Sequence, residues 1–141
     1  MAINAFVAGA FALITASFSV SAPAAETLLV CQGTKQGFLS GRDSGPQKRT
    51  FTIVREKDKV VSVKTDYHTF TLTRVNVASS ESQPPVFRQL VIEKDQLILR
   101  MEYPSENNRI ADTVIYSTGR YQEIAIDGAS KGQCTVGQKV F

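Results

Sequence analysis

Residues 86–93 and 96–103 read VFRQLVIE and QLILRMEY, and the Lys94-Asp95 pair separates them. In the second run two stripes alternate, namely Leu97, Leu99, Met101 and Tyr103 against Ile98, Arg100 and Glu102. An alternation of period two is typical of a β-strand, and a short polar pair between two such runs is typical of a hairpin. This stretch therefore predicts an antiparallel β-hairpin, from which the rest of the fold is inferred.

The same alternation extends along the chain on both sides of this hairpin. Segments rich in Val, Ile, Thr, Phe and Tyr are separated by turn clusters, and no helix-period pattern occurs after residue 25. The sequence therefore predicts an all-β protein of eight or nine antiparallel strands without an internal repeat. The expected strands cover residues 27–33, 49–55, 60–65, 69–77, 86–93, 96–103, 110–116, 120–127 and 133–141, with a connection over 128–132.

The N-terminal segment differs from the rest of the chain. Residues 5–20 form an apolar run, and Ala22 and Ala24 follow it as the small residues that a signal-peptidase site needs. This pattern predicts a helical signal peptide over residues 1–24, a single β domain over 25–141, and a periplasmic or secreted protein. An N-terminal membrane anchor and a lipoprotein modified at Cys31 are the alternatives. After the signal, no apolar run is long enough to span a membrane.

Cys31 and Cys134 are the only cysteines. An even count in a small exported domain indicates a disulfide, with two free thiols as the alternative. A disulfide holds two Cα atoms within about 7 Å of each other, so the first and last strands are expected to be neighbours. In an up-and-down meander this happens when the sheet closes on itself. We therefore expect an antiparallel meander that closes into a small barrel of about eight strands, with a β-sandwich as the alternative.

Charge is spread unevenly along the chain. The net charge is +3, and residues 26–75 carry nine Lys and Arg against five Asp and Glu. A basic half suits an anionic envelope component or an acidic protein as partner, and a normally solvated surface is the alternative. There is no basic block interleaved with aromatic residues, so we do not expect nucleic-acid binding. The oligomeric state stays open.

The sequence offers few groups for catalysis. His68 is the only histidine and no Gly-x-Ser-x-Gly motif accompanies it, so an exposed strand or turn histidine is expected. Asp112, Glu123 and Asp127 lie on neighbouring late strands, and a small carboxylate-dependent hydrolase would need two of them to converge. Solvated surface charges explain the three carboxylates more simply. We expect neither an enzyme nor a bound metal or cofactor.

The longest predicted connection covers residues 34–47. Loops of this length are often functional, and this one carries Phe38 and Leu39 beside Arg42 and Asp43. The apolar pair could anchor the loop in a partner's pocket while Arg42 steers the approach. Alternatively, Phe38 and Leu39 fold back and plug one end of the barrel.

Two resemblances accompany this reading. The segments IYSTGR (115–120), GQC (132–134) and KVF (139–141) resemble the endings of short exported proteobacterial proteins of unknown function. The overall plan is similar to the periplasmic C-type lysozyme inhibitors, which are small disulfide-pinned β-barrels that insert a loop into an enzyme cleft. The chain has no Ser-Gly-x-x-Tyr motif of that family, so the likeness concerns architecture.

These observations together predict a non-catalytic exported binding or inhibitor-like module that acts through loops at one end of a small β-barrel. Its expected partner is a protein or an anionic envelope component. A small carboxylate-dependent hydrolase and a structural envelope protein are the alternatives.

Overall fold

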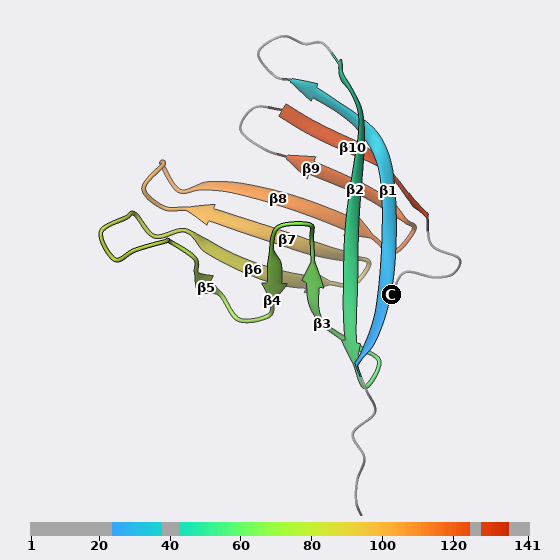
Figure 1. The fold of residues 1–141 in the computed structure, drawn as a ribbon, viewed down its shortest axis with the longest axis horizontal. Helices are drawn as coiled ribbons and strands as arrows, with labels where there is room; N and C mark the ends of the chain where they lie inside the picture. The colour runs from blue at the N-terminus through green and yellow to red at the C-terminus, as the bar shows by residue number, and fades with distance from the viewer. Residues whose placement is uncertain (1–23, 38–42, 125–127, 136–141) are drawn as a thin grey trace, which may run out of the picture.

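The structure of this chain is a computed structural model that describes residues 24–37, 43–124 and 128–135. In these ranges the chain forms ten β-strands (Figure 1), and no helix there could cross a membrane. The strands are β1 (Ala25–Gly37), β2 (Asp43–Glu56), β3 (Lys59–Lys64), β4 (Thr69–Thr71), β5 (Val75–Asn76), β6 (Phe87–Glu93), β7 (Gln96–Tyr103), β8 (Arg109–Tyr116), β9 (Arg120–Ile124) and β10 (Gly128–Thr135).

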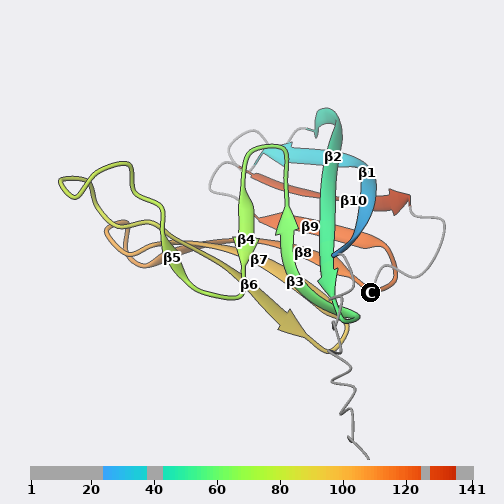
Figure 2. The same ribbon diagram turned by 60° about the horizontal axis from the view of Figure 1, so that its bottom comes forward.

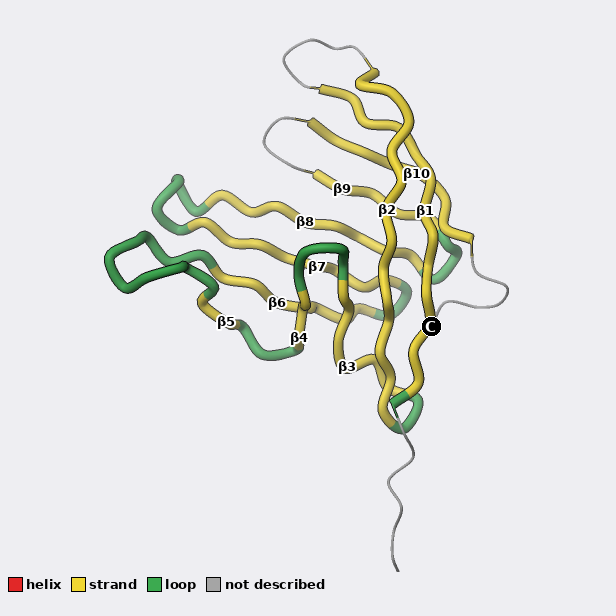
Figure 3. Tube along the Cα trace, in the orientation of Figure 1, coloured by secondary structure: helices red, strands yellow, loops and turns green. Residues whose placement is uncertain are grey.

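All ten strands belong to one antiparallel sheet. Its order is β4-β3-β2-β1-β10-β9-β8-β7-β6-β5, so each strand pairs with the next one in sequence except at β4 and β5, which do not pair, and β1 also pairs with β10. Figures 1 and 3 show the long β1–β2 pair crossing the β6–β9 strands at a steep angle. The second view shows β3 and β4 in front of β7 and β8 (Figure 2). The sheet therefore curls into an open half-barrel.

The predicted all-β meander is confirmed, and so is the contact between the first and last strands. Cys31 lies directly opposite Cys134 in the β1–β10 ladder, and the two form a disulfide. Cys31 is fully buried in the core. Such a bond is stable in oxidising compartments and rare in the cytosol, so it suggests an oxidising, extracytoplasmic environment. The predicted signal peptide lies outside the described residues.

The expected full closure into a barrel is wrong, and so is the two-sheet sandwich. The described strands form one continuous sheet whose two edges are β4 and β5. β5 is very short and pairs only with Arg88 and Phe87, and the connection that follows it contains Pro84 and Pro85. Proline has no amide hydrogen for a ladder. The chain therefore leaves the sheet at the place where closure would need a long edge strand.

Two predicted loops are wrong because strands extend through them. β1 runs on to Gly37 and β2 begins at Asp43, so strands occupy residues 34–37 and 43–47 of the expected loop. The expected connection over 128–132 is the first part of β10. Gly132 lies opposite Gly33 there, and a Cβ atom on Gly132 would lie 2.0 Å from the Gln32 carbonyl oxygen. These glycines allow close strand packing and do not mark a turn.

The hydrophobic core lies on the concave face of the sheet. The predicted hairpin is confirmed, and its register places Leu90 opposite Leu99 and Arg88 opposite Met101. The inward stripe of β7 joins apolar residues from β1, β2, β3, β4, β6, β8 and β9. The largest fully buried side chains are Tyr121, Leu29, Ile53, Leu90, Leu97, Leu99 and Ile115. This apolar set fills one part of the half-barrel and leaves the rest open.

Candidate functional site

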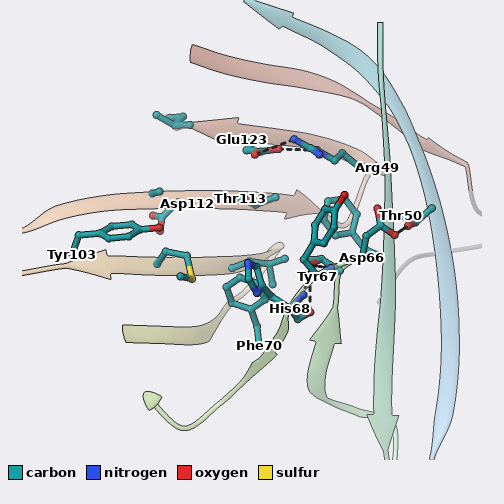
Figure 4. Close-up of a pocket in the computed structure, with 16 residues that line it drawn as sticks. Arg49, Thr50, Asp66, Tyr67, His68, Phe70, Tyr103, Asp112, Thr113 and Glu123 are labelled. Carbon is teal, nitrogen blue, oxygen red and sulfur yellow. Dashed lines mark hydrogen bonds and ion pairs between the residues drawn. The ribbon is translucent and has the colours of Figure 1, made fainter. Parts of the chain in front are cut away.

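The open part of the half-barrel contains a hollow of about 400 Å³ (Figure 4). Its walls come from β2, the β3–β4 turn, β4 and the inward stripes of β7, β8 and β9. A second hollow of about 490 Å³ lies between β6 and the connection that follows β5. His68, Met101 and Tyr103 line both hollows. We call the two hollows together the seam groove, because they follow the open seam between β4 and β6.

One wall of the seam groove is a charged network. Arg49 of β2 donates to Glu123 of β9, with Nε 3.2 Å from Oε2 and Nη2 3.5 Å from Oε1 (Figure 4). The Ser130 hydroxyl donates to the same Glu123 carboxylate at 3.3 Å. The Arg49 side chain is 34% exposed and the Glu123 side chain is 25% exposed. This wall therefore holds a largely satisfied ion pair and not a free charge.

The β3–β4 turn forms the rim above this wall. Thr65 organises the turn, because its hydroxyl accepts the Tyr67 and His68 amide hydrogens at 3.3 and 3.0 Å. Such local bonds are the usual way in which threonine fixes a tight turn. Asp66 is tied to Thr50 of β2 by a short hydrogen bond. Tyr67 is left 83% exposed beside the hollow, where its ring is free to contact a ligand (Figure 4).

Arg88 crosses the open seam from β6 to β4. Its Nη2 lies 2.9 Å from His68 Nδ1, and its Nη1 donates to the Thr69 carbonyl oxygen at 3.5 Å. Its guanidinium carbon is 5.6 Å from the centre of the Phe70 ring. Nearby, the Gln89 amide donates to the Leu72 carbonyl oxygen at 3.1 Å. Side chains therefore join β4 and β6 where no backbone ladder does.

Two groups of the concave side have shifted pKa values. Desolvation lowers the pKa of His68 below its usual 6.5, and the positive charge of Arg88 lowers it further. His68 is therefore neutral at pH 7, and its Nδ1 can accept the Arg88 hydrogen bond. Burial raises the pKa of Tyr121, and the Glu123 carboxylate adds to this effect. The Tyr121 hydroxyl makes no hydrogen bond of good geometry among the described residues. The Ser130 hydroxyl is nevertheless close enough to offset part of the increase in the Tyr121 pKa.

The hydrolase alternative needs two of Asp112, Glu123 and Asp127 to converge, and the first two residues both line the hollow of about 400 Å³. Glu123 faces the groove and Arg49, whereas Asp112 pairs with Arg100 through bonds of 2.9 and 3.0 Å. Asp112 alternates with Thr113, which is opposite Glu123 in the ladder, so the Asp112 carboxylate points to the face that carries Arg100 although the residue also lines the hollow. Asp127 is outside the described residues.

The other predicted site residues are placed as follows. Phe38, Leu39 and Arg42 lie outside the described residues, so the predicted partner-binding loop stays a prediction. Asp43 is the first residue of β2 and is opposite Gln36. His68 lies just before β4, as expected for an exposed turn histidine, and it also lines the groove. No group of three or more metal-ligating side chains occurs in the part of the chain that the structure describes.

Sequence reasoning named Glu123 and His68 but missed the two arginines that contact them in the groove, Arg49 and Arg88. Arg49 and Glu123 are distant in sequence, and only the three-dimensional pairing brings them together. Arg88 could have been found, because a two-residue turn in the predicted hairpin places it opposite Met101 on the inward stripe. An arginine among inward apolar residues is a signal of a buried polar contact or a ligand site.

Comparison with known proteins adds no relative to this picture, since no family model, no curated protein and no solved structure matches the chain.

Proposed function

We propose that this protein is a non-catalytic binding module, periplasmic or secreted, and that the seam groove holds the group it binds. The groove itself is the observation that carries the proposal. Its hollows of about 400 and 490 Å³ fall within the range of about 300–1,000 Å³ that small-molecule sites occupy. Apolar walls with a few placed polar groups are also typical of such sites.

The open seam supports this proposal. A closed barrel of about eight strands has an interior just wide enough for its own side chains. In this half-barrel the concave face stays accessible between β4 and β6, and the exposed Tyr67 ring stands at the rim. The expected partner, a protein or an anionic envelope component, would place one of its groups in this groove.

The arrangement of carboxylates supports binding without catalysis. A glycosidase needs two carboxyl groups about 5–9.5 Å apart on either side of one bond. Glu123 already accepts hydrogen bonds from Arg49 and Ser130, and Asp112 accepts them from Arg100. The disulfide between Cys31 and Cys134 and the N-terminal apolar run both support export.

The proposal is tested by NMR titration of the oxidised protein with octanol, octanoate and octylamine. These probes share one chain length and differ in charge. At least one of them is expected to shift the backbone amides of groove residues such as His68, Met101 and Thr113. If none of the three probes shifts these amides, the groove is not a binding site.

A pair of adjacent residues on β8 supplies the matched variants. Ala111 lines the groove, whereas Ile110 is 51% exposed and has the opposite orientation on the strand. Ala111→Phe fills the groove and is expected to weaken probe binding by about tenfold or more. Ile110→Phe is expected to stay within about twofold of wild type. If Ala111→Phe does not fold, Thr113→Leu serves the same purpose, and equal losses in the groove and control variants contradict the proposal.

A further inference from the structure

Arg88 is the one arginine of the seam groove that has no carboxylate partner among the described residues. Arg49, which lines the other hollow, pairs with Glu123, and the nearby Arg74 and Arg109 pair with Glu102 and Glu106. Arg88 instead contacts neutral groups: a histidine nitrogen, a backbone oxygen and the Phe70 ring. Partly buried cations are usually paired. Among the residues that the structure describes, no carboxylate therefore balances the charge of this guanidinium.

The donors of Arg88 are only partly used. A guanidinium carries five N–H donors, and Arg88 uses one in a bond of 2.9 Å and another in a long bond of 3.5 Å. Its Nε is buried and has no hydrogen-bond partner within residues 24–37, 43–124 and 128–135. An unmade hydrogen bond at a buried donor is costly. The guanidinium thus has both charge and hydrogen-bonding capacity left for a ligand.

The hollow beside Arg88 limits the kind of anion that fits. Its volume is about 490 Å³, and Val77, Pro84, Val86 and Met101 supply an apolar wall. Ser79, Gln83 and Ser105, among its other polar positions, are neutral. The Glu106 carboxylate also lines the hollow and pairs with Arg109, so a second negative charge on the ligand would be repelled there. These walls suit a molecule with one anionic head and an apolar body.

We propose that the seam groove binds a monocarboxylate with an apolar body, and that Arg88 holds the carboxylate through charge-assisted hydrogen bonds. This inference rests on the proposed function of the groove. Arg88 is well suited to the role because its planar guanidinium matches the two oxygens of a carboxylate. The apolar part of the ligand would lie against Met101 and Val86.

The alternative is that Arg88 only fastens β6 to β4. Both roles predict that Arg88→Gln weakens the fold, so stability alone does not separate them. Only a ligand role predicts a preference for carboxylate over an alcohol of the same length. The decisive quantity is therefore the ratio of the octanoate and octanol dissociation constants, which can be measured on the wild-type oxidised protein by NMR or calorimetry.

Octanoate is expected to bind about tenfold or more tightly than octanol, since a hydrogen bond to a charged group exceeds a neutral one by this amount. Arg88→Gln is expected to remove that preference. Arg74→Gln is the matched control, because Arg74 lies near the same seam but has its own partner, Glu102, and it should keep the preference. If Arg88→Gln does not fold, Arg88→Lys keeps the charge and should keep a weaker preference.

The possible outcomes separate this inference from the proposed function. If octanol and octanoate both shift groove amides with equal affinity, the groove binds ligands but the carboxylate inference is wrong. If inorganic phosphate displaces octanoate at similar concentrations, the site recognises anions without an apolar body and the inference is again wrong. If no probe shifts the groove amides, the proposed function itself fails.

Discussion

Removing the Cys31–Cys134 disulfide is expected to destabilise the domain strongly. The bond joins residues 103 apart in sequence, and a cross-link closing a loop of about 100 residues removes denatured-chain entropy worth about 4.7 kcal/mol at 25 °C. Cys31 is fully buried, so replacing it with alanine adds a packing loss in the same direction. A domain typically has a free energy of unfolding of only about 5–15 kcal/mol, so loss of the disulfide would remove a large part of it.

The assay is urea unfolding of the oxidised protein, the reduced wild-type protein and the Cys31→Ala/Cys134→Ala variant. The reduced protein isolates the effect of the bond, because it keeps both sulfur atoms in the core. We expect it to lose about 3–5 kcal/mol, and the double variant to lose slightly more. The slope of the unfolding free energy against urea should rise, because an unlinked denatured chain exposes more surface.

One result would refute this reasoning. If the reduced and oxidised proteins differ by less than about 1 kcal/mol, the chain-entropy argument does not apply to this domain. The β1–β10 ladder would then persist in the denatured ensemble and already hold the two cysteines together.

Three further predictions concern the ladder and the groove. Gly132→Ala places a Cβ atom 2.0 Å from the Gln32 carbonyl oxygen, so it should cost about 3 kcal/mol or more in urea unfolding, while Lys131→Ala on the same strand should cost little. Arg49→Leu leaves the half-buried Glu123 without its partner and should cost about 1–2 kcal/mol, and a double-mutant cycle with Glu123→Gln should recover about half of this loss. The pKa of His68 is about 6.5 in the unfolded chain and lower in the folded protein. At a pH between these two pKa values the unfolded chain binds more protons than the folded protein. The wild-type protein should therefore lose stability as the pH falls below 6.5. The difference from His68→Gln should therefore shrink or change sign between pH 7 and about pH 5, and parallel stability curves for the two proteins would contradict this assignment.

The sequence was most informative where structure is local. The hairpin over 86–103 and the two alternating stripes of its second strand were predicted, because alternation and a short turn are patterns of neighbouring residues. The disulfide and the pairing of the first and last strands followed from the count of cysteines. The role of Gly128 and Gly132 was not predictable in this way, because a glycine that allows close strand packing looks like a turn glycine until its partner strand is known.

The seam groove could not be predicted from the sequence, because it is formed by strands and side chains that are distant from one another along the chain. The sheet stays open because β5 is short and because the connection after it leaves the sheet. Neither feature is visible as a pattern in the sequence. The Arg49–Glu123 pair joins β2 to β9 across the half-barrel. Arg88 is the exception, since its inward position could have been read from the hairpin that was predicted correctly.

The strand order has a consequence for the connectivity of the domain. Read from β5 through β10 to β1 and on to β4, the sheet is an uninterrupted sequence of neighbours. A circular permutant that is opened between Thr71 and Val75, with a short linker from the end of β10 to the start of β1, would therefore be a simple up-and-down meander. In that protein Cys31 and Cys134 would lie on strands joined by one short connection, so the same disulfide would close a small loop. Its entropic contribution would fall accordingly, although every contact in the folded sheet would be the same.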